Sequence, residues 1–363
     1  MPGKSSSFFS SVHILGSRQL GGADRFYVRL VSALHQDNYR VLAVNRPGSP
    51  VSPLLDKAGV AQVQVALANQ WDLWSVLKIK RLIEQWQPAV VQTYMGRATR
   101  LTRLPKNCGA IHIARLGGYY KIDGYYRHAH AWVGNTQGIC DYLVRSGLPP
   151  SRVFKIGNFV PPPLTFSHRR IAELKRQWNI PEDALVIAAL GRMYPVKGFD
   201  DLLHAFSRLT AAIHQRPLWL AIAGDGPQLG DLRQLARELG IASRIIWTGW
   251  LNPPDPLYAV ADLFVCPSRH EPLGNVILEA WNYRLPVVST STLGATELIE
   301  PDVNGLLVEP RQPAALAQRI HSLLVSPENE RQKIGEAGRQ TLVRDHSREA
   351  VVQAYLALYR QLT

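Results

Sequence analysis

Two glutamates, Glu271 and Glu279, carry the strongest chemical signal in the sequence because they stand on either side of a short loop. Pro272 and Gly274 indicate a tight turn, and residues 276–281 are predicted to form a helix. A helix N-terminus binds anions through its unpaired amides. The amides in question belong to Leu273, Gly274 and Asn275. We expect phosphates on these amides, with one carboxylate facing a sugar and the other a ribose.

A second signal is a pair of cations, Arg192 and Lys197, five positions apart in a loop that contains Pro195. A guanidinium group binds two oxygens at once, whereas an ammonium group acts as a point charge. Together they would hold a diphosphate from two sides and stabilise the charge of a leaving group without a metal ion. The alternative is a pair of ordinary surface cations, and the nearby glutamate motif argues against it.

A third segment, residues 224–227, reads Gly-Asp-Gly-Pro. Glycines allow the backbone to approach a ligand, but they also form simple turns. By itself this segment is more typical of a turn.

Each of the three segments follows a short apolar run that is typical of a strand buried in a parallel sheet. These runs are residues 184–190, 218–223 and 263–267, and further strands are predicted at 244–248 and 285–289. Helical spacing follows at 199–209 and 229–239. Alternating strands and helices predict a doubly wound sheet, in which ligands bind at the carboxyl ends of the strands.

The first half shows the same alternation less cleanly. A helix is predicted at 25–34, and strands are predicted at 11–15, 39–44, 89–92, 110–114 and 131–134. Three prolines at 161–163 indicate a stiff linker. We therefore predict an N-terminal domain over 1–160, a C-terminal domain over 161–345, and a last helix within 346–363.

Taken together and in this order, the motifs resemble those of the retaining GT-B glycosyltransferases of family 4. The family pattern G-R-x4-K-G matches residues 191–198, G-D-G-P matches 224–227, and E-P-x-G with its second glutamate matches 271–279. The resemblance covers most of residues 150–345. It implies an α/β protein of two Rossmann-like doubly wound domains that face each other across a cleft. It also implies that the last helix, within 346–363, packs back on the N-terminal domain.

The resemblance also implies roles for the site residues. Arg192 and Lys197 would stabilise the diphosphate leaving group, Glu271 would contact the donor sugar, and Glu279 would bind the ribose hydroxyls. The remaining donor-binding residues are Gly21, Gly22, Gly224, Leu273, Gly274 and Asn275. The donor would be a nucleoside diphosphate sugar, UDP by default, and no metal or cofactor is expected.

The N-terminal domain would bind the acceptor, a saccharide or glycolipid. The candidate residues are Tyr94, Arg97, Arg115 and Lys121. Tyr94 departs from the histidine that many family members have at this position. Arg97, Arg100 and Arg103 are three apart, which predicts a basic stripe on a helix. The alternative is an ordinary amphipathic surface. The segment from Tyr94 to Lys121 resembles the corresponding segment of a bacterial subgroup that builds lipopolysaccharide or other cell-surface glycans.

The charge of the chain is concentrated in its first half. Of 363 residues with net charge +13, residues 1–160 contain 20 Lys and Arg against 7 Asp and Glu, whereas the rest contain 21 of each kind. One basic domain beside a neutral one indicates an anionic partner, and a general surface bias is the alternative. We expect peripheral contact with the anionic inner face of the plasma membrane and no binding of nucleic acid.

Composition agrees with a cytoplasmic enzyme. Apolar residues make up 46% of the chain, and no run reaches the roughly 18 apolar residues of a membrane span. Residues 1–11 lack the features of a secretory signal. The three cysteines lack metal-ligand spacing, so we expect reduced thiols.

Three other functions remain as alternatives. A GT-B sugar-nucleotide epimerase would share the fold but use no acceptor. An NAD-dependent oxidoreductase is disfavoured because no G-x-G-x-x-G follows the first strand. A basic adaptor that binds membranes or nucleic acid would explain the charge but would leave the Glu and Arg/Lys motifs without a function.

Overall fold

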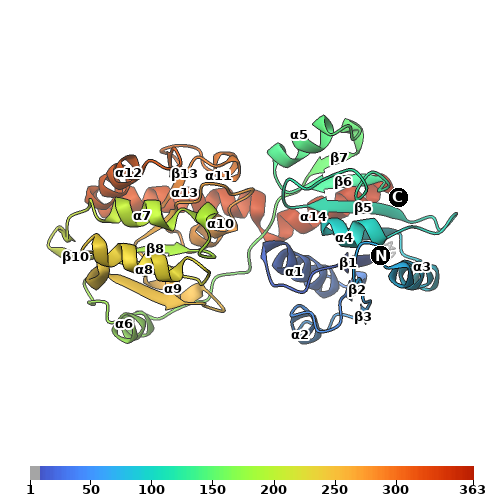
Figure 1. The fold of residues 1–363 in the computed structure, drawn as a ribbon, viewed down its shortest axis with the longest axis horizontal. Coiled ribbons are helices and arrows are strands. Elements are labelled where there is room, and N and C mark those ends of the chain that lie inside the picture. The colour runs from blue at the N-terminus through green and yellow to red at the C-terminus, as the bar shows by residue number, and fades with distance from the viewer. Residues whose placement is uncertain (1–8) are drawn as a thin grey trace, which may run out of the picture. The chain divides into compact units, whose positions relative to one another are not determined.

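The computed structural model describes residues 9–363, so most of the segment in which the sequence predicts no secretory signal lies outside the described residues. The chain divides into two compact units (Figure 1). Unit 1 contains the described residues up to Phe159 together with Arg348–Thr363, and unit 2 is Val160–Ser347. The fold is α/β, and each unit is built on its own mainly parallel sheet.

Unit 1 has a seven-stranded parallel sheet in the order β3-β2-β1-β4-β5-β6-β7. Its strands are β1 (Ser10–Leu15), β2 (Arg40–Asn45), β3 (Gln62–Gln64), β4 (Val90–Tyr94), β5 (Ile111–Leu116), β6 (Ala131–Gly134) and β7 (Val153–Lys155). The central strands are almost entirely buried, which explains their continuous apolar runs.

Helices cover both faces of this sheet. They are α1 (Gly22–Gln36), α2 (Ser52–Lys57), α3 (Leu73–Trp86), α4 (Met95–Leu101), α5 (Gln137–Arg145) and α14 (Arg348–Leu362), with a short 3-10 turn η1 (Pro150–Arg152). Helices α1, α2 and α14 contribute to the core on one face, and α3 and α4 to the core on the other. Alternate residues of β1 therefore enter different cores, as the pleat of a strand requires.

The last helix, α14, belongs to unit 1 although it comes from the far end of the chain (red in Figure 1). Tyr355 and Tyr359 are buried in the core that α1 also lines. The Tyr359 hydroxyl donates to Oε1 of Gln92 on β4 at 2.7 Å. At the start of the helix, the Arg348 guanidinium contacts the Asp37 carboxylate at 2.6 Å. Apolar burial and two polar contacts thus fix α14 on unit 1.

Unit 2 has a sheet in the order β11-β10-β8-β12-β13-β14, with a short antiparallel strand β9 beside β10. Its strands are β8 (Leu185–Leu190), β9 (Ala212–Ile213), β10 (Arg216–Ala223), β11 (Ile245–Gly249), β12 (Leu263–Cys266), β13 (Val287–Thr290) and β14 (Leu306–Val308). Apart from β9, the strands run parallel.

The helices of unit 2 also form two layers. They are α6 (His168–Gln177), α7 (Phe199–Phe206), α8 (Leu229–Glu238), α9 (Asp255–Val260), α10 (Asn275–Asn282), α11 (Leu293–Leu298), α12 (Pro313–Val325) and α13 (Glu328–His346), with 3-10 turns η2 (Pro195–Lys197) and η3 (Ala242–Arg244). Helices α7, α8 and α12 pack on one face of the sheet. Helices α6, α9 and α10 pack on the other, with Leu342 of α13 in the same core.

The α/β fold class predicted from the sequence is confirmed, and the predicted strands and helices are present with ends shifted by a few residues. The sequence missed β3, β7, β9 and β14, which have only two or three residues each. Such strands lie at or near sheet edges and are too short to show a period. All three cysteines are free thiols.

Candidate active site

The three motifs follow three neighbouring strands. In the unit 2 sheet, β8 lies between β10 and β12. The chain moves from β8 to β10 on one side, whereas β12 pairs with β8 on the other, so the strand order reverses here. Ligands of open α/β sheets bind outside the carboxyl ends of the strands at such a reversal. The topology therefore gathers residues 191–198, 224–227 and 267–274 at one edge.

Close backbone contacts join the first two loops. The Gly224 backbone has a φ of +138°, and a Cβ atom there would lie 1.9 Å from the Gly191 carbonyl oxygen. The Met193 amide donates to the Asp225 carbonyl at 2.9 Å. Only glycine permits this approach, so Gly224 has a structural reason to be glycine besides its predicted contact with the donor.

Arg269 joins the loop after β8 to the loop after β12. Its amide donates to the Val196 carbonyl at 2.8 Å, and its guanidinium donates to the Pro195 carbonyl at 3.1 Å. The same guanidinium pairs with Asp200 and Asp201 at the start of α7, at 2.6 and 2.9 Å. These acids lie in the first turn of α7, where negative charge also suits the helix dipole. Arg269 thereby fixes the turn that carries Lys197. The sequence analysis did not select it.

Lys197 and Glu271, from the first and third motifs, are in direct contact. The Lys197 ammonium donates to Oε2 of Glu271, and the side chains are 25% and 14% exposed. Burial alone lowers the pKa of the Lys197 ammonium, but the Glu271 carboxylate more than compensates and raises that pKa above its usual value. Lys197 is therefore protonated at neutral pH. Its ammonium group has three N–H donors, so it can bind an anion while it donates to Glu271.

Arg192 is exposed at the end of β8, next to this pair. It is close enough for its charge to oppose the protonation of Lys197. The two cations predicted to hold a diphosphate thus lie near each other, and Lys197 also pairs with Glu271.

The predicted helix after the glutamate loop is α10, which begins at Asn275. Its cap residue, Gly274, has a φ of +88°, a left-handed conformation that favours glycine. Leu273 is buried, and its backbone packs tightly against Gly294. A Cβ atom added at Gly294 would lie 2.5 Å from backbone atoms of Leu273. The Gly294 amide also donates to the Glu271 carbonyl at 3.0 Å. Gly294 therefore supports the loop, a role that the sequence analysis missed.

Glu279 lies about one turn inside α10, where a tyrosine holds its carboxylate. The Tyr258 hydroxyl donates to Oε2 of Glu279 at 3.0 Å, and the Tyr258 ring stacks on Tyr283 with 5.6 Å between centroids. Burial, aided by the Glu279 carboxylate, raises the pKa of the Tyr258 phenol well above its usual value, so the phenol remains a donor. Tyr258 was not found from the sequence because it lies on α9, outside every motif.

The predicted residues of unit 1 lie at the carboxyl edge of its own sheet. Gly21 ends the loop of residues 16–21 that follows β1 and caps α1, and Gly22 is the first helical residue. The Gly21 amide donates to Oδ2 of Asp24 at 2.8 Å. They belong to a different compact unit from the residues described above. Their predicted contact with the donor remains a prediction.

Tyr94 does not fit its predicted role as an acceptor-binding residue. Its side chain is fully buried, its hydroxyl lies 2.9 Å from Nδ1 of His13, and it accepts from Nε2 of Gln92 at 2.8 Å. Because Gln92 also binds Tyr359, the hydroxyl of Tyr94 belongs to a buried network that holds α14. Its position at the end of a central strand, packed under α1 and α14, explains the burial.

Arg115 is also buried, and the predicted basic stripe is only partly helical. The Arg115 guanidinium lies 4.0 Å from the Phe26 ring centroid and donates to Oδ1 of Asn158. Helix α4 ends at Leu101, so the prediction that Arg103 extends the stripe on the helix is wrong. Thr102, the residue after the helix, has an extended backbone, so Arg103 cannot continue the helical spacing.

The two remaining acceptor candidates differ in exposure. Arg97 is half-buried and donates to the Leu67 carbonyl at 3.2 Å, which gives it a structural role. Lys121 is exposed. Of the four candidates, Lys121 has the side chain most accessible to an acceptor.

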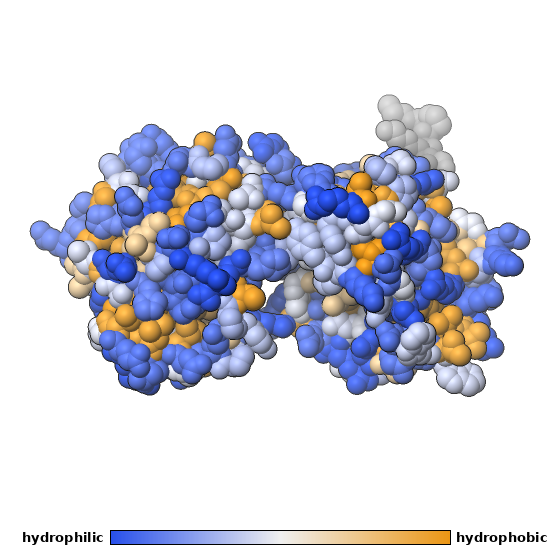
Figure 2. Space-filling model, turned by 45° about the horizontal axis from the view of Figure 1, so that its top comes forward, coloured by the Kyte–Doolittle hydropathy of each residue, from blue (hydrophilic) through white to orange (hydrophobic). Residues whose placement is uncertain are grey.

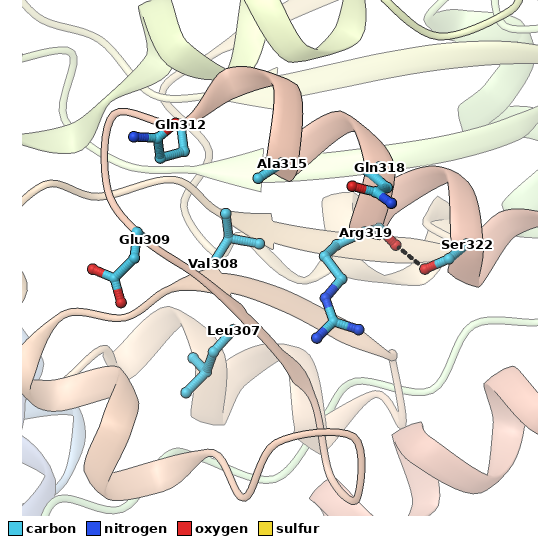
Figure 3. Close-up of a pocket in the computed structure, with 8 residues that line it drawn as sticks. All are labelled: Leu307, Val308, Glu309, Gln312, Ala315, Gln318, Arg319 and Ser322. Carbon is cyan, nitrogen blue, oxygen red and sulfur yellow. Dashed lines mark hydrogen bonds between the residues drawn. The ribbon is translucent and has the colours of Figure 1, made fainter.

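A hollow of about 570 Å³ lies elsewhere on unit 2, between β14 and α12 (Figure 3). Its lining residues are Leu307, Val308, Glu309, Gln312, Ala315, Gln318, Arg319 and Ser322. None of them is a predicted site residue, and Arg319 pairs with Asp302 at 3.2 Å. Among the described residues, no group of three or more His, Cys, Asp or Glu side chains is arranged to hold a metal ion.

Comparison with known proteins agrees with this geometry. Residues 170–341 match the family model described as glycosyl transferases group 1. The lipopolysaccharide core biosynthesis glycosyltransferase LpsE of Rhizobium meliloti (strain 1021) is 35% identical over 341 residues, which cover 93% of this chain and 95% of the relative. The chain belongs to the group 1 glycosyltransferases.

Solved structures show that this glycosyltransferase has the GT-B fold. A glycosyltransferase from Rickettsia africae ESF-5 aligns with a TM-score of 0.84 at 20% identity, over 98% of both chains. Anabaena Alr3699/HepE in complex with UDP and glucose aligns with a TM-score of 0.83 at 19% identity, over 97% of this chain and 100% of the other. Within residues 9–363, no helix combines the length and apolar character that crossing a membrane requires.

Proposed function

We propose that this glycosyltransferase moves a sugar from a nucleoside diphosphate sugar, with UDP as the expected nucleotide, to a hydroxyl group of a saccharide or glycolipid. The acceptor belongs to lipopolysaccharide or cell-surface glycan synthesis, and transfer takes place at the cytoplasmic face of an anionic membrane. The enzyme retains the configuration of the anomeric carbon, needs no metal ion and is of the family 4 type.

The contact between Lys197 and Glu271 is the observation that carries this proposal. It unites the cation that would meet a diphosphate with the carboxylate that would meet a sugar, at a reversal of strand order. Arg192 and the amides at the start of α10 add further positive potential. The names of two similar proteins support the same substrates, since LpsE acts in lipopolysaccharide core biosynthesis and HepE was solved with UDP and glucose.

The proposed chemistry depends on stabilising the leaving group. The bond between the anomeric carbon and the diphosphate oxygen breaks, so negative charge grows on the diphosphate and positive charge on the sugar ring. Lys197 and Arg192 stabilise the first charge, and the Glu271 carboxylate lies beside the second. The acceptor oxygen then bonds to the anomeric carbon from the face that the diphosphate leaves, and its proton passes to a diphosphate oxygen.

Thermal unfolding with candidate donors tests the proposal. One of UDP-glucose, GDP-mannose or ADP-glucose should raise the unfolding midpoint, since a ligand at 100 times its Kd adds about 2.7 kcal/mol of stability. The Lys197→Ala variant should lose this shift, whereas Lys333→Ala, on the exposed face of α13, should keep it. No shift with any donor or with UDP would contradict the proposed donor class.

Product analysis tests the reaction itself. With donor and a lipopolysaccharide-derived acceptor, NMR of the product should show the anomeric configuration of the donor, and chelation of metal ions should leave the rate unchanged. Inversion would contradict the retaining mechanism. Conversion of the donor into an epimer without acceptor would indicate the epimerase instead.

A further inference from the structure

Four large apolar side chains are exposed close together at the start of α3. Trp71, Leu73, Trp74 and Leu77, here called the tryptophan patch, are 69%, 72%, 84% and 48% exposed. Single exposed apolar residues are normal, but a contiguous group of this kind marks a surface that contacts a partner. At the right-hand end of Figure 2, the end where Figure 1 draws α3, orange hydrophobic surface lies beside blue hydrophilic surface.

The backbone of the tryptophan patch is firmly held. Three arginines donate to carbonyls of the preceding loop: Arg46 to Ala66 at 2.9 Å, Arg97 to Leu67 at 3.2 Å, and Arg100 to Gln70 at 2.9 Å. Asp72 caps α3 by accepting from the Ser75 amide at 3.0 Å. The exposed side chains are therefore presented by an ordered backbone, which lowers the entropy that binding must overcome.

Arg100 also stacks on the patch itself. Its guanidinium carbon lies 4.2 Å from the centroid of the Trp71 ring, within the range of a cation–π contact. The indole thus keeps one face against a cation while 69% of the residue stays exposed. This orientation suits an aromatic ring at the boundary between lipid tails and headgroups.

Cations follow the tryptophan patch along α3. Lys78, Lys80 and Arg81 are all exposed, and Glu84 is the acidic residue of this face. At 100° per residue, Leu77, Lys80 and Arg81 project on the same side of the helix as Leu73. Apolar and aromatic residues beside Lys and Arg are the pattern of a surface that lies in the interface of an anionic bilayer.

We propose that the tryptophan patch docks this glycosyltransferase on an anionic lipid bilayer, with Lys78, Lys80 and Arg81 on the headgroups. The proposal deepens the membrane contact included in the proposed function and rests on that part of it. A bilayer fits better than a second copy of the chain, because a symmetric contact would bring these cations against each other.

The position of the patch in the sheet agrees with its docking role. The loop before α3 leaves the carboxyl end of β3. The Gly21 loop after β1 and the N-terminus of α4 after β4 lie at the same edge, because all strands of this sheet are parallel. A bilayer touching the patch would therefore approach the edge of unit 1 at which we place the acceptor.

Vesicle binding of the full chain tests the inference. Wild type should bind phosphatidylcholine vesicles that contain phosphatidylglycerol, weakly bind pure phosphatidylcholine, and release with salt. The double variant Trp71→Ser/Trp74→Ser should bind about tenfold less or weaker still, since it loses the interfacial aromatics. Its matched control is Trp250→Ser, which removes a tryptophan that is 53% exposed on unit 2 and should bind as wild type does.

Several outcomes would overturn the inference. Unchanged binding of the double variant would reject the tryptophan patch while leaving the membrane contact in place. Absence of wild-type binding to any vesicle would reject both, whereas the donor shift described above would still report on donor binding and the product analysis on glycosyl transfer. A wild-type dimer that the double variant converts to monomer, by sedimentation velocity, would assign the patch to a contact between copies. As a folding control, the double variant and Trp250→Ser should have the thermal unfolding midpoint of wild type.

Discussion

Gly198 lies so close to Pro267 that a Cβ atom at position 198 would be 2.1 Å from the Pro267 carbonyl oxygen. Gly198 directly follows Lys197, and Pro267 is the first residue after β12, in the loop that leads to Glu271. The close approach of these two backbones therefore brings the ammonium of one loop to the carboxylate of the other.

The first prediction concerns this approach. Gly198→Ala should lower the free energy of unfolding of unit 2 by about 3 kcal/mol or more, because the φ of +65° is strained for alanine and the carbonyl must also move. Donor binding should weaken with it, since the Lys197–Glu271 contact is displaced. Urea unfolding and donor titration measure the two effects.

Gly240→Ala is the matched control. Gly240 has a similar φ of +69°, but nothing lies within 4 Å of the Cβ position. Its free energy of unfolding should fall by only about 1 kcal/mol, the cost of the left-handed backbone for alanine, and donor binding should be unchanged. Equal losses in the two variants would show that the Pro267 contact has no importance.

The second prediction concerns the pair itself. Lys197→Ala and Glu271→Ala should each reduce turnover tenfold or more, which corresponds to about 1.4 kcal/mol of transition-state stabilisation. The double variant should lose less than the product of the single losses, because the two side chains act through one contact. Near-wild-type steady-state kinetics in both single variants would remove this assignment.

The third prediction concerns the support of Glu279. Tyr258→Phe removes the hydroxyl that donates to its carboxylate at 3.0 Å and should raise the donor KM several-fold, for a loss of about 1 kcal/mol. The kcat should change little, because the ribose lies away from the reacting bond. Tyr283→Phe keeps the ring that stacks on Tyr258 and leaves Glu279 untouched, so its donor KM should match wild type. A kcat effect without a KM effect in Tyr258→Phe would contradict the ribose role.

The fourth prediction concerns pH. Burial lowers the pKa of the His13 imidazole from 6.5 to about 3. Below pH 6.5 the unfolded chain therefore binds a proton that the folded chain rejects, and stability falls by about 1.4 kcal/mol per pH unit down to the folded pKa. This contribution is fully present above pH 6.5. Urea unfolding of unit 1 between pH 7.5 and 4.5 should show the decline.

The variant His13→Asn should flatten this decline, even if it is less stable at every pH. His321→Asn, which removes an exposed histidine of α12, serves as the control and should leave the slope as it is. Burial also lowers the pKa values of His112, His128 and His130, so part of the slope should persist in His13→Asn. A slope that does not differ between His13→Asn and wild type would refute a contribution from His13.

Local chemistry explains why much of unit 2 could be predicted. The strands β8, β10 and β12 are apolar runs buried on both faces. The loops after β8 and β12 contain residue types that suit a nucleotide sugar, and the loop after β10 contains the Gly-Asp-Gly-Pro turn. The sequence could not predict Arg269 or Tyr258. Both act across loops that are distant in the chain, so no local pattern records their contacts.

In unit 1 the amino-acid sequence alone determined the alternation of strands and helices and the concentration of positive charge, because these depend on composition and period. Only the tertiary structure decided which polar side chains are buried. Tyr94 and Arg115 are hidden, whereas the large aromatic rings of Trp71 and Trp74 are exposed. Burial depends on which helices cover a position. Here α1 and α14, from opposite ends of the chain, pack over Tyr94, whereas Trp71 and Trp74 at the start of α3 stay 69% and 84% exposed.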